Sequence, residues 1–239
     1  MAMDGLALRA VVTELQILVG GKIDKIQQPE KDMLVLTIRS ERTNRRLLIH
    51  THAENGRIQF TERTFDNPQV APAFCMLLRR HLTGGRILAV EQQGPDRVCT
   101  LSVSARNELM DDVQLRLCVE LMGKHGNLTL VGPDGAILDC LRRVSPSETT
   151  LRTLMPGFAY LPPPAQGKAD PFAAGEDAFA AAYALEDPAR GLTSAFEGIS
   201  RQTAQALTGR CKTPRELYDL FAGFAGGRFA PCVAMDPAG

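Results

Sequence analysis

With 239 residues, the chain is long enough for one large domain, or for one domain and a small companion. Its 27 Lys and Arg residues balance 27 Asp and Glu residues, which excludes the whole-chain basic signature of many nucleic-acid-binding proteins. Any RNA contact must therefore use local patches. No run of about 18 apolar residues occurs, so the sequence predicts no membrane span and no membrane partner.

The first residues do not resemble an export signal. Asp4 stands where a basic segment is expected, and Arg9 and Glu14 interrupt the apolar run. The six cysteines are scattered and form no C-x-x-C motif, so we expect reduced thiols and no cofactor or metal held by them. Together these features predict a cytoplasmic protein.

The first part of the chain mixes helical and strand patterns. A helical period over residues 4–19, capped by Asp4, predicts one helix, and residues 70–82 predict a second amphipathic helix. A pair of glycines follows each helix and stops it. Short alternating runs separated by turn residues predict an antiparallel meander. Its expected strands are residues 22–28, 33–39, 46–52, 57–61, 86–92, 97–103, 113–121, 128–131 and 136–143.

The pattern breaks at residues 156–171, where five prolines and two glycines predict a linker. An Ala-rich stretch follows, and we expect its helices at residues 175–185, 188–195, 200–208 and 213–223. We therefore predict an α+β domain over residues 1–165, a small all-helical domain over residues 172–225 and a loose tail over residues 226–239.

A polar loop, Met-Gly-Lys-His-Gly-Asn at residues 122–127, lies between two hydrophobic runs. It lacks the upstream glycine and the hydroxyl residue of a P-loop, so we do not expect nucleoside-triphosphate binding of that kind. Two interpretations stay open. The loop is either a nest of backbone N–H groups that binds an anion beside Lys124, or a bulged hairpin turn with positive φ at its glycines.

A second turn, Gly94-Pro95-Asp96-Arg97, leads into a predicted strand. Its composition predicts a type I turn with proline at the second position. The alternative is a functional pair, in which Asp96 fixes the guanidinium group of Arg97 and Arg97 grips a phosphate or stacks on a base.

Other polar residues give weaker indications. His50 and His52 share a strand face and could ligate a metal, but no cysteine or well-placed carboxylate completes the set, so solvated histidines are favoured. Several basic clusters would form a phosphate-binding patch if the fold grouped them, and would otherwise be solvated faces. These clusters are Arg42, Arg45 and Arg46; Arg79, Arg80 and His81 with Arg86; and Arg142 with Arg143.

A glycine-containing turn, Gly198-Ile199-Ser200, separates two expected helices. It fits a helix-hairpin-helix that offers backbone N–H groups to a phosphate, and it fits an ordinary αα-corner equally well. The sequence holds no G-x-S-x-G motif, and no pair of carboxylates stands out. We therefore expect no catalytic residues and no enzymatic activity.

Several landmarks occur in a fixed order along the chain. They are MDG-x-x-L, GGKIDKIQQP, NP-x-x-APAFCMLLRRHLTGGRI, GPDRV, E-x-MGKHGNL-x-LV, R-x-LMPG-x-x-Y and PPP. In this order they resemble the N-terminal domain of the NFACT family, whose older label is fibronectin-binding protein A N-terminal domain. The resemblance covers residues 1–165 closely, and residues 175–223 fit the family's helix-hairpin-helix domain.

The resemblance implies a fold similar to the N-terminal domain of formamidopyrimidine-DNA glycosylase. That fold is an antiparallel β-sandwich or barrel-like domain flanked by two long helices. The resemblance also implies a factor of ribosome-associated quality control, which binds a large ribosomal subunit with its rRNA and peptidyl-tRNA. Such a factor recruits charged tRNA, alanyl-tRNA in bacteria, and extends the stalled chain without mRNA. No cofactor and no small-molecule substrate is implied.

The resemblance also implies a set of tRNA-binding residues. Arg97 and Lys124 are expected to meet RNA phosphates or base edges, and Asp96 and Glu120 are expected to orient them. The whole implied set is Asp4, Asp96, Arg97, Glu120, Met122, Lys124, His125 and Asn127.

Members of the family continue into a coiled coil and a further RNA-binding domain. We therefore expect this chain to be a fragment that does not extend stalled chains alone. Three alternatives remain. The first is a glycosylase-like DNA repair protein, although the N-terminal proline nucleophile is missing from Met1-Ala2-Met3. The others are a fibronectin-binding adhesin and a scaffold domain without a ligand.

Overall fold

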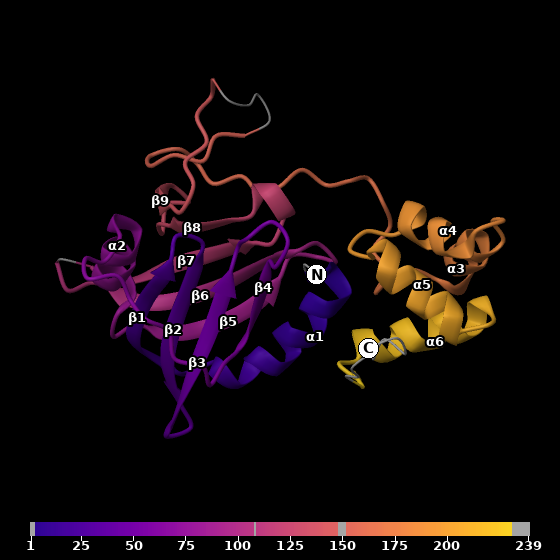
Figure 1. Ribbon diagram of the computed structural model, residues 1–239, viewed down its shortest axis with the longest axis horizontal. Helices are drawn as coiled ribbons and strands as arrows, with labels where there is room; N and C mark the ends of the chain where they lie inside the picture. The colour runs from indigo at the N-terminus through magenta and orange to yellow at the C-terminus, as the bar shows by residue number, and fades with distance from the viewer. Residues whose placement is uncertain (1–2, 108, 148–151, 231–239) are drawn as a thin grey trace. The chain divides into compact units, whose positions relative to one another are not determined.

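The computed structural model describes residues 3–107, 109–147 and 152–230 (Figure 1). The chain divides into two compact units, residues 1–166 and 167–239. The first unit is α+β, with a large antiparallel sheet, and the described part of the second unit is helical. The division falls within the proline-rich stretch at residues 156–171, where the sequence predicted a linker.

The sheet of the first unit contains nine strands in the order β4-β3-β2-β1-β5-β6-β7-β8-β9. All neighbours are antiparallel, and each strand pairs with the next one along the chain except at the junction of β1 and β5, where Lys22 pairs with Arg86. The predicted antiparallel meander is therefore confirmed. The strands are β1 (Lys22–Glu30), β2 (Met33–Ser40), β3 (Thr43–His50), β4 (Arg57–Phe60), β5 (Arg86–Gln92), β6 (Val98–Arg106), β7 (Asp112–Glu120), β8 (Asn127–Val131) and β9 (Ile137–Cys140).

Two helices pack on this sheet. Helix α1 (Gly5–Leu15) has 11 residues and helix α2 (Ala73–Leu82) has 10 residues, so the expectation of two long helices is wrong. After Leu15 the chain tightens into a 3₁₀ turn over residues 16–18. Helix α2 begins only after Pro72, whose extended backbone forms the N-cap. Both are of ordinary length for a globular protein.

The two halves of the sheet share one hydrophobic core. Leu36 of β2, Leu101 of β6 and Leu8 of α1 belong to the same buried cluster. The loop between β7 and β8 also reaches the end of β3, because a Cβ atom at Gly126 would lie 2.5 Å from the carbonyl oxygen of Thr51. Since β3 and β8 are far apart in the strand order, the sheet folds back on itself at this end.

The second unit contains α3 (Glu176–Tyr183), α4 (Pro188–Ala195), α5 (Arg201–Arg210) and α6 (Pro214–Ala225). Phe179 is at its centre, with its ring centroid 4.6 Å from that of Phe196 and 5.2 Å from that of Phe221. Of the predicted tail, residues 231–239 lie outside the described residues. Within the described part of the chain, every helix is too short or too polar to cross a membrane.

Candidate functional site

A hollow of about 510 Å³ lies in the first unit, where the sheet folds back on itself. Four segments converge on it: the turn before β6, the β7–β8 loop, the chain after β9, and the returning stretch at residues 152–164. Its wall is partly basic and partly apolar. It is lined by Arg97, Met122, Lys124, His125, Gly126, Asn127, Arg142, Val144, Arg152, Leu154, Pro163 and Pro164. Five of the eight residues in the implied tRNA-binding set are among them.

The β7–β8 loop presents the basic residues Lys124 and His125 at the rim of the hollow. Both lie in a 3₁₀ turn over residues 123–125 and are exposed. Gly123 has a φ of +57°, whereas Gly126 has a φ of −57°. The loop is therefore a hairpin connection in which only the first glycine needs the left-handed region, and the second is needed for its close approach to Thr51.

The turn before β6 differs from the predicted type I turn. Its hydrogen bond joins Asp96 N–H to the Gln93 carbonyl at 3.1 Å, so the turn begins one residue early. Gly94, with a φ of +54°, takes the second position, which a type I turn reserves for negative φ. The Asp96 carboxylate accepts a hydrogen bond from the backbone N–H of Arg97 at 2.7 Å. This bond holds the backbone of Arg97 at the end of the turn.

The guanidinium group of Arg97 and the ammonium group of Lys124 carry the uncompensated charge of the hollow. Arg97 is half-buried and Lys124 is exposed. Neither side chain has an acidic partner among the described residues, and no carboxylate of that part of the chain lines the hollow. The hollow is therefore a local centre of positive charge in a chain with no net charge.

Asp4 belongs to the start of α1 and lies near this turn. Its carboxylate caps the helix by accepting Ala7 N–H at 2.9 Å. The side-chain amide of Gln92 then donates to the carbonyls of both Gly5 and Asp96, each at 2.8 Å. Gln92 thus joins the start of α1 to the turn that carries Arg97, and Asp4 is not among the residues that line the hollow.

Glu120 has a different partner from the one we expected. Its side chain is fully buried and accepts from Arg152 Nη1 at 2.8 Å, from Arg152 Nη2, and from the hydroxyl of Tyr160 at 2.9 Å. The expectation that Glu120 orients Arg97 and Lys124 is therefore wrong, because the buried β7 end faces the returning segment. The carboxylate instead anchors Arg152 in the wall of the hollow.

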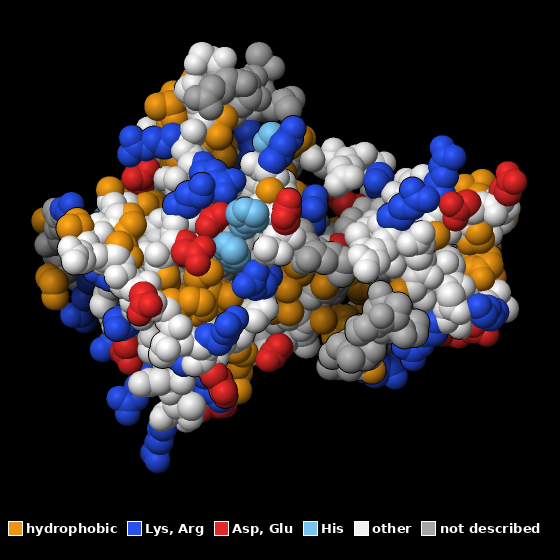
Figure 2. Space-filling view, in the orientation of Figure 1, with side chains coloured by type: hydrophobic (Ala, Val, Ile, Leu, Met, Phe, Trp, Pro, Cys, Tyr) orange, Lys and Arg blue, Asp and Glu red, His pale blue; other side chains and the backbone are white. Residues whose placement is uncertain are grey.

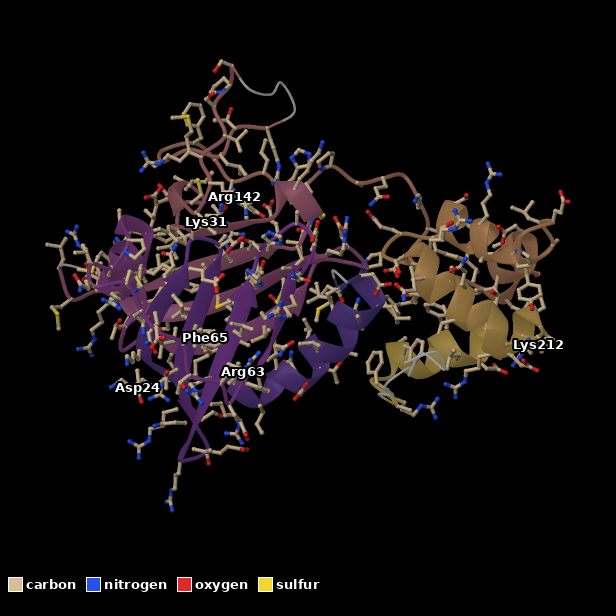
Figure 3. The ribbon with its side chains drawn as sticks, viewed as in Figure 1. Asp24, Lys31, Arg63, Phe65, Arg142 and Lys212 are labelled. Atoms are coloured by element: carbon tan, nitrogen blue, oxygen red, sulfur yellow. The ribbon has the colours of Figure 1, made fainter. Side chains whose placement is uncertain are left out.

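The buried side chain of Asn127 forms two hydrogen bonds with the backbone of Arg142. Its Oδ1 accepts Arg142 N–H at 2.9 Å and its Nδ2 donates to the Arg142 carbonyl at 2.7 Å. The Arg142 guanidinium group lies 3.4 Å from the Lys124 carbonyl and 3.9 Å from the Asp32 carboxylate. Figure 3 shows Arg142 beside the β1–β2 turn that carries Lys31. These contacts hold Arg142 at the junction of three loops.

The two histidines singled out in the sequence lie together, with ring centroids 5.8 Å apart. Figure 2 shows histidine side chains side by side among acidic and basic groups. His50 Nε2 is 3.4 Å from Asp32, and its Nδ1 is 3.2 Å from the guanidinium group of Arg57, which must donate. The ligand atoms of Glu30, Asp32 and His50 lie within 4.8 Å of one another, so the expectation that no well-placed carboxylate accompanies these histidines is wrong. His50 Nε2 is buried and makes no hydrogen bond within the described residues. A metal-bound histidine normally donates through its second nitrogen, whereas Nδ1 of His50 accepts from Arg57, so this geometry does not favour a metal.

The family comparison settles the identity of the fold. The family described as NFACT N-terminal and middle domains matches residues 4–222. The chain belongs to this family. The Streptococcus pneumoniae relative named Rqc2 homolog RqcH is 39% identical over 236 residues, which cover 98% of this chain and 42% of the relative. The Bacillus subtilis relative of the same name is 35% identical, covering 98% of this chain and 43% of the relative.

The NFACT chain therefore spans less than half the length of these two relatives. A solved structure agrees with the assignment. The N-terminal part of the fibronectin/fibrinogen-binding protein from Streptococcus suis superposes with a TM-score of 0.84 at 34% identity, covering 91% of this chain and 84% of that one. The family predicted from the ordered sequence landmarks is confirmed.

The NFACT fold does not bring the residues of the predicted phosphate patch together on one surface. These residues are Arg79, Arg80, Arg86, Arg142 and Arg143. Of these five residues, only Arg142 lines the hollow. Arg143 forms a two-bond pair with Asp139 at 3.2 and 3.3 Å, so its charge is matched. Arg79 donates to a β1 carbonyl at 2.8 Å, and Arg86 lines a separate hollow. Arg80 also does not line the main hollow. The sequence could not show this, because the grouping depends on strand order.

Arg152 lines the hollow, and the sequence analysis did not single it out as a site residue. It begins the landmark R-x-LMPG-x-x-Y, but it follows the last strand in a stretch without regular structure, so no helical or strand period indicates where its side chain lies. Glu120 could have indicated that a partner such as Arg152 exists. It is an acidic residue between Val119 and Leu121, at the end of a strand that is buried on both faces. A buried carboxylate requires a cationic or hydrogen-bonding partner, which must come from elsewhere in the chain.

The Gly198-Ile199-Ser200 turn of the NFACT chain lies between α4 and α5. Gly198 has a φ of +76°, Ile199 is buried, and Ser200 caps α5 by accepting Thr203 N–H at 3.1 Å. The turn therefore presents the N-terminus of a ten-residue helix.

Proposed function

We propose that this NFACT chain binds tRNA as part of a factor of ribosome-associated quality control. The observation that carries the proposal is the hollow, which gathers Arg97, Lys124 and Arg142 beside an apolar wall of Met122 and Leu154. Cations attract RNA phosphates, and apolar surface next to them accommodates an unstacked base. At about 510 Å³, the hollow is within the range of small-ligand sites, which suits a nucleotide.

The names of the relatives support the ribosomal setting. Two of them are called Rqc2 homolog RqcH, and this chain matches nearly half of each. In the proposed role the first unit contacts charged tRNA, alanyl-tRNA in bacteria, on an obstructed large ribosomal subunit with its rRNA and peptidyl-tRNA. Extension of the stalled chain belongs to the whole factor. The chain itself acts in the cytoplasm as a binding module, without catalytic residues or a cofactor.

The second unit contributes a helix-hairpin-helix contact in this proposal. The start of α5, which follows Ser200, carries the positive end of the helix dipole, and this favours a phosphate. The glycine at position 198 allows the close backbone approach that such a contact requires.

The test is binding of alanyl-tRNA and of a mismatched tRNA by the chain over a range of salt concentrations. The proposal expects tight binding at low salt and a log–log salt slope equivalent to several phosphates. The same assay is repeated with fibronectin, because the similar Streptococcus suis structure carries the name fibronectin/fibrinogen-binding protein. Fibronectin binding without tRNA affinity would favour an adhesin, and cleavage of an oxidised-purine DNA duplex would favour a glycosylase.

A further inference from the structure

A second hollow, of about 320 Å³, lies between strands β1–β3 and the residues that follow β4. We call residues 61–67 the strap and this hollow the groove. The groove has no lining residue in common with the hollow around Arg97. It is lined by Lys25, Gln27, Pro29, Val35, Arg46, Arg63, Thr64, Phe65 and Asn67.

Strand register places two cations in the groove. Lys25 of β1 pairs with Thr37 of β2, and Thr37 pairs with Arg46 of β3, so the three residues form one row across the sheet. Side chains in such a row share a face. The next row, Ile26, Leu36 and Leu47, belongs to the buried core. Lys25 and Arg46 therefore project from the opposite, outer face.

The strap adds the third cation and is firmly attached. Thr61 N–H donates to the Arg46 carbonyl at 2.9 Å, and the Arg46 guanidinium group donates to the Glu62 carbonyl. Phe65 packs against a small cluster on the outer face, formed by Met33, Val35 and Leu48. Figure 3 shows Phe65 and Arg63 close together over the strands. This attachment holds Arg63 over the groove.

The groove has no matching negative charge. None of its described lining residues is acidic, although Glu62 and Asp66 are neighbours in the sequence. Within the described ranges, the side chains of Lys25 and Arg63 have no hydrogen-bond or ion-pair partner, and Arg46 bonds only to a carbonyl. The adjacent Arg45, in contrast, pairs with Glu41 at 3.4 Å. Three uncompensated cations around polar amides and a hydroxyl have the chemistry that binds phosphate oxygens.

We propose that the groove binds the sugar-phosphate backbone of RNA, as a second contact separate from the hollow around Arg97. The inference rests on the proposed RNA-binding function and adds a site to it. Phe65 is occupied by its packing, so the groove offers no free ring on which a base could stack. Gln27, Thr64 and Asn67 can bond phosphate and sugar oxygens of any sequence, so the contact contributes affinity without sequence selection.

The test compares tRNA binding by the wild-type chain and the Lys25→Ala/Arg63→Ala variant across salt. Both side chains are exposed, so the variant should keep the wild-type Tm. We expect affinity at low salt to fall about tenfold and the log–log salt slope to fall by about 2, because two phosphate contacts are lost. The matched control, Lys25→Arg/Arg63→Lys, keeps both charges and should bind within about twofold of wild type.

Three outcomes would overturn the inference. If wild type binds tRNA and the alanine variant binds equally well with the same slope, the groove is not an RNA site, whereas the proposed function stands. If wild type binds no tRNA, both proposals fail. If pyrophosphate binds wild type but not the alanine variant, and tRNA affinity is the same for both, the groove is a small-anion site. The inference is supported if the salt slope falls in the alanine variant and stays at the wild-type value in the control.

Discussion

Glu120 and Arg152 are 32 residues apart in the sequence and form a buried ion pair, with Oε1 and Nη1 2.8 Å apart. The pair joins the end of β7 to the stretch that returns over the sheet and supplies one wall of the hollow. Burial alone would lower the pKa of Arg152, but the hydrogen bond and negative charge of Glu120 more than offset it, and the pKa of Arg152 is raised. Arg152 therefore stays charged and anchored.

Glu120→Ala should destabilise the first unit by about 3 kcal/mol, because it leaves the guanidinium group of Arg152 buried without its counter-charge. Urea unfolding at neutral pH measures the change. Tyr160→Phe removes one hydrogen bond to the same carboxylate and should cost only about 1 kcal/mol.

The matched control for the ion pair is Asp112→Ala, which breaks an exposed pair with Arg106 at 3.6 Å. Its cost should be below about 1 kcal/mol, since exposed ion pairs contribute little. If Glu120→Ala and Asp112→Ala cost the same, the buried pair does not anchor the wall.

Asn127→Ala should weaken tRNA binding even though the Asn127 side chain is buried and bonded to protein. The change removes both hydrogen bonds to the Arg142 backbone, which fix the place of Arg142 in the hollow. We expect the free energy of unfolding to fall by about 1–3 kcal/mol. We also expect weaker tRNA binding at a temperature where the variant is still folded. An unchanged affinity in the folded variant would show that the position of Arg142 does not matter for RNA.

Local patterns predicted the elements of the fold better than its contacts. The strand expected at residues 33–39 is Met33–Ser40, and the helix expected at residues 188–195 is Pro188–Ala195. Alternation and caps are properties of neighbouring residues, so the sequence carries them directly. Helix α2 began later than predicted because the proline before it took the cap position.

The candidate site was predictable only where polar residues occupy a recognisable turn. Arg97 and Lys124 lie in recognisable turns, and the structure brings both to one hollow. Arg152 and the contact between Asp32 and Arg142 depend on how the sheet folds back, which joins segments more than 30 residues apart. Strand order and long-range ion pairs have no local signal, so the predicted partner of Glu120 was wrong.

Gly126→Ala should disturb the β7–β8 loop, because the new Cβ atom would lie 2.5 Å from the Thr51 carbonyl oxygen. The loop must shift, and we expect a loss of roughly 1–3 kcal/mol of stability together with weaker tRNA binding. Gly209→Ala is the control. It adds a methyl group to α5 with no atom within 4 Å, so it should raise helix stability by up to about 1 kcal/mol. Equal effects of the two substitutions would contradict the close packing of the loop.

Stability should fall in alkaline solution. Burial raises the pKa of the Cys99 thiol from 9.0 to about 12, and burial with the nearby Glu120 charge raises the pKa of Tyr160. Because the native state holds these protons more tightly, their contribution is complete below about pH 9 and is lost as the pH rises toward about 12. Urea unfolding from about pH 8 to about pH 11 measures this loss, and Cys99→Ala should reduce it. A stability that is constant or rises over this range would contradict the burial of these groups.

The most direct test of the central claim is tRNA binding by the Arg97→Ala/Lys124→Ala variant over a salt series. These two side chains carry the uncompensated charge of the hollow, so we predict weaker binding at low salt and a log–log salt slope reduced by about 2. Arg106→Ala, which removes an exposed cation already paired with Asp112 from the far end of β6, should bind like wild type. If the double variant matches wild type in both affinity and slope, the hollow is not where this chain binds tRNA.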